Sequence, residues 1–141
     1  MKAILAIDQG TTGTTVAVMN TRGVLLGSVN YEFPQIYPKP GWVEHDPEAI
    51  WASVFKGIRA VFRRGLCKPN EVACIGITNQ RETSLLWERR RGKPLGNAIV
   101  WQCRRTASFC EGLRKKGLEP MVRDRTGLCL LYTSPSPRDD T

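Results

Sequence analysis

The chain has 141 residues, of which 41% are hydrophobic and 24% charged, so its size and composition are those of one globular domain. No apolar run approaches the length of a membrane span, and the N-terminus lacks the pattern of a signal peptide, so we expect a cytoplasmic protein. The net charge of +8 is scattered in short clusters without interleaved aromatic residues, so we do not expect nucleic acid as a partner. The five cysteines form no Cys-x-x-Cys pair, which indicates reduced thiols rather than a disulfide framework or a zinc site.

Three β-strands joined by short turns are predicted at the N-terminus. Apolar or alternating residues mark strands at 3–7, 14–19 and 24–33. Because the connections are too short for parallel crossovers, these strands form an antiparallel meander.

The turn between the first two strands is a candidate anion site. It begins with Asp8 at a strand end and continues with glycines and hydroxylated residues, namely Gly10, Thr11, Thr12, Gly13 and Thr14. Backbone N–H groups of such a turn can converge on an anion, and the hydroxyls add donors. Asp8 could hold Mg²⁺ through water. An ordinary glycine hairpin explains the same residues equally well, and the Gly-Lys-Ser/Thr of a Walker A loop is absent.

A helix is predicted after a proline-rich loop at 34–40. Asp46 can cap it, Pro47 suits its first position, and Gly65 follows its end. Its apolar residues repeat at the helical period and predict one core-facing side: Ile50, Trp51, Val54, Phe55, Ile58, Val61 and Phe62. His45, the only histidine, precedes the cap, and we interpret it as a hydrogen-bonding loop residue rather than a catalyst.

A second candidate site follows a predicted buried strand at 71–78. The strand ends in the polar residues Asn79, Gln80, Arg81 and Glu82. Open α/β sheets bind ligands at such strand ends, and an adjacent guanidinium and carboxylate suit a small molecule with several hydroxyls. A solvated strand end with a surface ion pair is the simpler interpretation of the dipeptide alone. Further strands at 84–88 and 97–101 and a helix at 102–116 complete a mixed α/β pattern.

Four segments together resemble the glycerol kinases of the FGGY carbohydrate-kinase family. In chain order they are Asp8-Gln9-Gly10-Thr11-Thr12, Gly41-Trp42-Val43-Glu44-His45-Asp46-Pro47, Gly76-Ile77-Thr78-Asn79-Gln80-Arg81-Glu82-Thr83 and Asn97-Ala98-Ile99-Val100-Trp101-Gln102-Cys103-Arg104-Arg105. The first is shared by many actin-like kinases, whereas the other three are specific to glycerol kinases. Another FGGY sugar or polyol kinase, and a non-catalytic polyol- or nucleotide-binding module, are the alternatives.

The resemblance implies an actin-like, ribonuclease-H-like ATPase domain that transfers the γ-phosphoryl group of ATP, with Mg²⁺, to glycerol, giving sn-glycerol 3-phosphate. By position, Arg81 and Glu82 would bind the glycerol hydroxyls, and Trp101 would form an apolar wall. Residues 10–14 would contact the nucleotide phosphates, and Asp8 would lie near the metal. The resemblance also implies a homo-oligomer for the full-length protein.

The sequence departs from the family pattern at three places. Thr15 stands where many relatives have an arginine that reaches the nucleotide, and Gly13 replaces a common serine. From residue 129 onward the sequence no longer follows the family, so we expect the first part of the FGGY first domain at 1–128 and a non-native or disordered tail at 129–141. The general-base aspartate is expected beyond residue 141, which predicts that this chain alone is inactive.

Overall fold

The structure is a computed structural model that describes residues 2–127 and 130. It divides into two compact units, one formed by Met1–Gln35 with His45–Arg81 and the other by Ile36–Glu44 with Glu82–Thr141. The expected tail at 129–141 lies outside the described residues except for residue 130. Within the described part of the chain, every helix is too short or too polar to cross a membrane.

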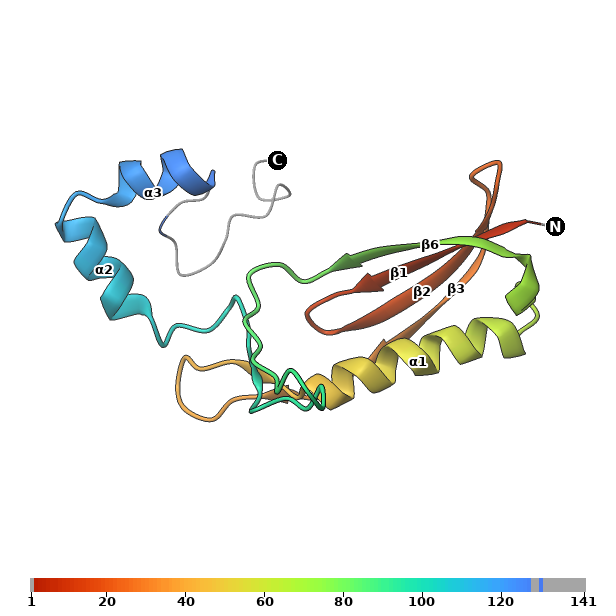
Figure 1. The fold of residues 1–141 in the computed structure, drawn as a ribbon, viewed down its shortest axis with the longest axis horizontal. Coiled ribbons are helices and arrows are strands. Elements are labelled where there is room, and N and C mark those ends of the chain that lie inside the picture. Colours follow the sequence, from red (N-terminus) through yellow and green to blue (C-terminus); the bar gives the residue numbers. More distant parts are fainter. Residues whose placement is uncertain (1, 128–129, 131–141) are drawn as a thin grey trace. The chain divides into compact units, whose positions relative to one another are not determined.

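A four-stranded mixed sheet forms the centre of the first unit (Figure 1). Its strands are β1 (Ala3–Gln9), β2 (Gly13–Asn20), β3 (Leu25–Glu32) and β6 (Val72–Asn79), in the order β3-β2-β1-β6. The pairs β1–β2 and β2–β3 are antiparallel, which confirms the predicted meander. β6 runs parallel to β1, so the mixed α/β sheet is confirmed as well.

Helix α1 (Pro47–Arg63) packs on β2 and β3 and encloses the core of the first unit. The side chain of Asp46 accepts a hydrogen bond from the Glu48 N–H at 2.9 Å, so the predicted N-cap is confirmed. The fully or nearly fully buried core side chains are Ala3, Leu5, Ile7, Val16, Val18, Val29, Ala60, Val61 and Cys67.

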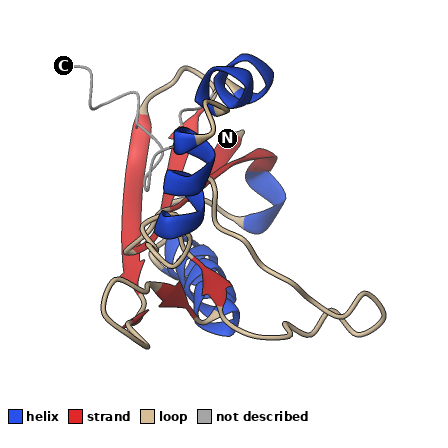
Figure 2. Cartoon of the chain, turned by 90° about the vertical axis from the view of Figure 1, so that its left-hand side faces the viewer, coloured by secondary structure: helices blue, strands red, loops and turns tan. Residues whose placement is uncertain are grey.

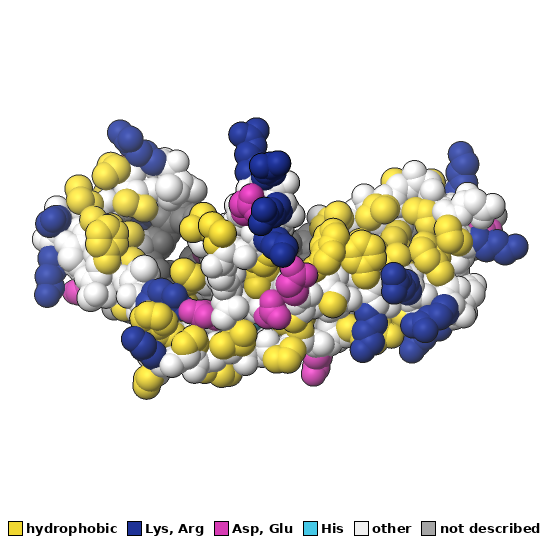
Figure 3. Space-filling view, turned by 60° about the horizontal axis from the view of Figure 1, so that its bottom comes forward, with side chains coloured by type: hydrophobic (Ala, Val, Ile, Leu, Met, Phe, Trp, Pro, Cys, Tyr) yellow, Lys and Arg dark blue, Asp and Glu magenta, His cyan; other side chains and the backbone are white. Residues whose placement is uncertain are grey.

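The predicted core-facing side of α1 is partly wrong. Trp51 and Phe55 are 61% and 41% exposed. Their rings lie edge to face, with the ring centroids 4.8 Å apart. Small residues face the sheet instead, and a Cβ placed on Gly57 would lie 2.5 Å from Cγ2 of Val16. The helix therefore approaches the sheet too closely for large side chains there. Figure 3, turned toward the side on which α1 lies, shows hydrophobic side chains exposed among lysine and arginine side chains.

The expectation that β6 is a buried strand is also wrong. Ile75 and Ile77 are 55% and 73% exposed. The strand lies at one end of the sheet order, with β1 as its neighbour, and α1 packs mainly on the opposite end. Its apolar sequence therefore reflects a strand surface that these elements leave uncovered.

A second, smaller sheet has the order β4-β5-β7, formed by β4 (Gln35–Ile36), β5 (Glu44–His45) and β7 (Ala98–Ile99). The strand predicted at 97–101 is thus only two residues long. The strand predicted at 84–88 is absent: the segment folds back on itself, with the Glu88 N–H donating to the Lys93 carbonyl at 2.7 Å, and forms only isolated bridges. Isolated bridges join Ser84 to Ile99 and Trp87 to Pro94.

Three further helical segments are short: η1 (Pro69–Glu71), α2 (Ala107–Lys115) and α3 (Glu119–Thr126). Long loops precede α2 (Figure 2). The helix predicted from 102 begins only at Ala107, because the N–H of Arg104 donates to the Gly41 carbonyl at 2.7 Å rather than entering a helix. Helix α3 was not predicted.

Candidate functional site

The two polar segments of the first unit lie at the same edge of the sheet. β1 and β6 are parallel, with Asp8 opposite Thr78 and Gln9 opposite Asn79. Beyond the last pair, the N–H of Gln80 donates to the Gln9 carbonyl at 2.8 Å. Parallel strands have their carboxyl ends at one edge, so the turn after β1 and the segment entering Arg81 are neighbours.

The glycine turn after β1 is held by its own backbone. The Gly10 N–H donates to the Gly13 carbonyl at 2.9 Å, and the Gln9 side-chain amide donates to the Gly10 carbonyl at 2.7 Å. Gly13 lies tightly against β3, because a Cβ there would be 2.9 Å from the Tyr31 carbonyl oxygen. A side chain on this residue would require the β3 backbone to shift.

Thr14 differs from the expectation for a phosphate-contacting hydroxyl. Its side chain is fully buried, and its Oγ1 lies 2.7 Å from Oγ of Ser53 on α1. The hydroxyl is therefore part of the contact between the helix and the sheet. Thr12 is exposed and Thr11 partly exposed, so these two hydroxyls remain the side-chain donors of the turn.

Asp8 is exposed at the end of β1, where it lines an open depression of about 330 Å³ on the sheet surface. Thr15 and Thr78 line the same depression, and the Asn30 side chain donates to the Thr15 hydroxyl at 2.8 Å. No group of three or more His, Cys, Asp or Glu residues that could hold a metal occurs among residues 2–127 and 130. The single carboxylate suits Mg²⁺, which keeps several waters and binds through one or two carboxylates and substrate phosphates.

The predicted substrate-binding residues fall in both units. Arg81 is exposed and ends the first unit, while Glu82 is exposed and Trp101 partly buried in the second. Glu82 has φ of 57° and is the only non-glycine residue with positive φ among the described residues. Such a backbone conformation is uncommon for glutamate and tends to occur at functional sites.

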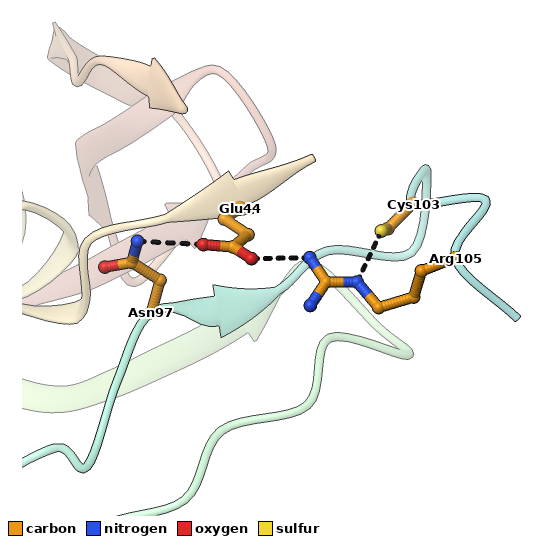
Figure 4. A network of polar contacts seen from close by, with 4 residues as sticks. All are labelled: Glu44, Asn97, Cys103 and Arg105. Carbon is orange, nitrogen blue, oxygen red and sulfur yellow. Dashed lines mark hydrogen bonds and ion pairs between the residues drawn. The ribbon is translucent and has the colours of Figure 1, made fainter. Parts of the chain in front are cut away.

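A polar network that the sequence did not predict orders the segment carrying Trp101 (Figure 4). Glu44 lies at its centre: Nη2 of Arg105 is 2.5 Å from Oε1, and Nδ2 of Asn97 donates to Oε2 at 2.9 Å. The guanidinium of Arg105 also lies 4.0 Å from the ring centroid of Trp42. These hydrogen bonds hold the pKa of Glu44 below its ordinary value. The bond from Arg105 has the larger effect and the bond from Asn97 the smaller. Asn97 and Arg105 flank Trp101 in sequence, so the network fixes both ends of its loop.

A second set that the sequence did not predict joins the buried side chains of His45 and Gln80 to Gln35, which is partly exposed. They come from segments far apart in sequence, so no spacing pattern could have grouped them. The single hint was Gln80, which directly follows the polar end of β6.

Comparisons with known proteins agree on one family. The model of the FGGY family of carbohydrate kinases, N-terminal domain, matches residues 3–137. The chain is 50% identical over 127 residues to the glycerol kinase of Caldanaerobacter subterraneus subsp. tengcongensis, covering 90% of this chain and 26% of that protein. It is 54% identical over 127 residues to the glycerol kinase of Salmonella arizonae, covering 90% of this chain and 25% of that protein.

A solved structure shows the same fold. The crystal structure of Plasmodium falciparum glycerol kinase with ADP matches with a TM-score of 0.82 and 34% identity, covering 94% of this chain and 26% of that one. The sheet is thus part of the actin-like, ribonuclease-H-like ATPase fold. The chain spans about a quarter of the length of these relatives. It belongs to the FGGY family of carbohydrate kinases.

Proposed function

We propose that this chain supplies the phosphate-binding turn and the polyol-binding side chains of a glycerol kinase, which transfers the γ-phosphoryl group of ATP to glycerol. The observation that carries the proposal is the identity of 50% or more, over 127 residues, with proteins named glycerol kinase. The convergence of the β1 and β6 ends at one sheet edge supports it.

Arg81 and Glu82 are proposed to bind the hydroxyls of glycerol. A guanidinium donates several hydrogen bonds in a fixed plane, and a carboxylate accepts several, so together they match a molecule in which every hydroxyl donates and accepts. Trp101 would pack against the carbon skeleton. A site of this kind rejects analogues that lack a hydroxyl, because its own polar groups would be left unpaired.

The nucleotide phosphates are proposed to lie at the turn formed by residues 10–13. The hydroxyls of Thr11 and Thr12, and backbone N–H groups of the turn other than that of Gly10, which bonds to the Gly13 carbonyl, would donate to phosphate oxygens. Bound Mg²⁺, held by Asp8 through water, would supply the positive charge that neutralises the transferring phosphoryl group.

A chimeric enzyme tests the proposal. Residues 1–127 would replace the segment that they match in the Caldanaerobacter glycerol kinase, and ATP-dependent formation of sn-glycerol 3-phosphate would be measured. We expect turnover, with Glu82→Gln raising the KM for glycerol about tenfold, since one charged hydrogen bond is weakened.

Trp51→Phe is the matched control, because Trp51 lies exposed on α1 and belongs to none of the segments assigned to the proposed site. It should leave the KM for glycerol unchanged. A folded chimera that phosphorylates a pentulose but not glycerol would instead favour another FGGY specificity, and a folded chimera inactive on both would refute the proposal.

A further inference from the structure

A chain of hydrogen bonds, partly buried at Gln35 and buried at His45 and Gln80, joins the glycine turn to the residue before Arg81 within the first unit. It begins at the turn, where the Gln35 side-chain amide donates to the Thr11 carbonyl at 3.0 Å and to the Phe33 carbonyl at 3.4 Å. Both N–H groups of this amide are therefore directed at backbone oxygens.

His45 continues the chain. Its Nε2 lies 2.5 Å from Oε1 of Gln35, and its Nδ1 lies 3.1 Å from Nε2 of Gln80. The ring is 0% exposed and lies edge to face with Phe33, with the ring centroids 5.1 Å apart. Gln80 ends the chain, bonded through its own N–H to Gln9 and preceding Arg81 directly.

The direction of every bond in this chain is determined by its ends. Because the Gln35 amide nitrogen serves two carbonyls, its oxygen must face His45, so Nε2 of the ring carries the proton. Nδ1 is then an acceptor, and it receives a hydrogen from Gln80. Reversing either glutamine amide would set two acceptors or two donors against each other in a buried site, which is costly.

The ring is neutral in this arrangement, and its surroundings favour that form. Burial lowers the pKa of His45 below its ordinary value, because a charged ring would lose its hydration. A proton on Nδ1 would also point at the amide hydrogens of Gln80.

We propose that His45 is a positioning residue that sets the placement of the turn formed by residues 10–13 relative to Arg81. The inference rests on the proposed function, in which these two segments hold the phosphates and the polyol. Phosphoryl transfer depends on the alignment of its two substrates, and misplacement by about 1 Å costs about 100-fold in rate. A buried ring with one donor and one acceptor is a rigid spacer between the segments.

The first test needs no ligand and uses the whole 141-residue chain. Ring ¹⁵N NMR should show neutral His45 with its proton on Nε2 at neutral pH. His45→Phe keeps an aromatic ring but neither hydrogen bond, so backbone amide resonances of both Gly10–Gly13 and Arg81 should move. Trp51→Phe, the control on the exposed side of α1, should move neither. A proton on Nδ1, or a His45→Phe effect confined to one segment, would overturn the inference.

The second test adds ATP with Mg²⁺ to the same chain. In the unaltered chain the amides of residues 10–13 and of Arg81 should respond together. In His45→Phe the turn should still respond while Arg81 loses most of its shift, and His45→Gln, which again offers one donor and one acceptor, should restore it. A full Arg81 response in folded His45→Phe would contradict the positioning role.

The two proposals fail separately. If the first test succeeds and the unaltered chain shows no response to ATP with Mg²⁺, the hydrogen-bonded connection stands and the phosphate site of the proposed function fails. If His45→Phe unfolds the chain, Gln80→Leu replaces it, since this variant removes the donor to Nδ1 and keeps the His45 ring.

Discussion

His45 gives the first unit a pH dependence that can be worked out at the scale of one residue. Its pKa in the folded chain is lowered by burial from an ordinary value of 6.5. The unfolded chain therefore takes up a proton near pH 6.5 that the folded chain resists. The stability contribution is present above pH 6.5 and is lost as the pH falls through the folded pKa.

We expect the free energy of unfolding, measured with urea by fluorescence, to decrease as the pH is lowered from about 7.5 to about 5.5. His45→Gln should flatten this decrease, because glutamine does not titrate. An equally steep decrease in the variant would mean that another group causes it.

Glu44 acts in the second unit over a lower pH range. Its pKa is also lowered, from an ordinary value of 4.5, so its contribution is present above pH 4.5 and is lost as the pH falls through the folded pKa. Glu44→Gln should destabilise this unit at neutral pH by about 1–2 kcal/mol, since Arg105 loses a charged acceptor.

Hydrogen exchange of the Asn97–Arg105 amides at neutral pH would measure this loss as faster exchange. Glu88→Gln is the matched control, because its ion pair with Arg91 at 3.8 Å is largely exposed. Faster exchange in both variants alike would argue against a specific role of Glu44.

At the scale of elements, the contact of α1 with the sheet depends on small residues rather than on the apolar stripe. Ser53, Gly57 and Ala60 are buried against the sheet, while Trp51 is exposed. Thr14 faces Ser53 because alternation along β2 places its side chain on the same face as Val16, which α1 covers.

Gly57→Ala should therefore destabilise the chain by a net of about 1 kcal/mol, because overpacking against Val16 costs about 1–3 kcal/mol and the gain in helix propensity returns about 1 kcal/mol. Thermal unfolding followed by circular dichroism would measure it. Gly112→Ala in α2 is the control, since a Cβ there meets nothing within 4 Å. It should be neutral or stabilising, and a Gly57→Ala variant as stable as Gly112→Ala would refute the close contact.

At the scale of the molecule, we expect the exposed surface of β6 to promote association between copies of the chain. Ile75 and Ile77 are exposed on a strand with one neighbour in the described sheet. Unpaired strand edges and exposed apolar side chains promote pairing between chains.

We expect Ile77→Lys to reduce self-association of the 141-residue chain, measured by sedimentation velocity and light scattering. Val24→Lys is the control, because Val24 is 55% exposed and directly precedes β3, which β2 and β1 separate from β6 in the sheet order. An equal effect of both substitutions would point to net charge rather than to the β6 surface.

Local patterns in the sequence determined much of the first unit. Short turns imposed the antiparallel meander, Asp46 and Pro47 defined the start of α1, and polar residues marked two strand ends. These features depend on neighbouring residues, so composition and spacing were enough to predict them. The family followed from four motifs in order, because their residues and spacing are specific.

Only the tertiary structure decided which surfaces are covered. The sequence could not show that α1 approaches β2 closely at Gly57, that Trp51 and Phe55 are exposed, or that β6 is exposed, because burial depends on which elements pack against each other. It also could not group Gln35, His45 and Gln80, or Glu44 with Asn97 and Arg105. Those contacts join residues 10 to 61 positions apart, and folding alone brings them together.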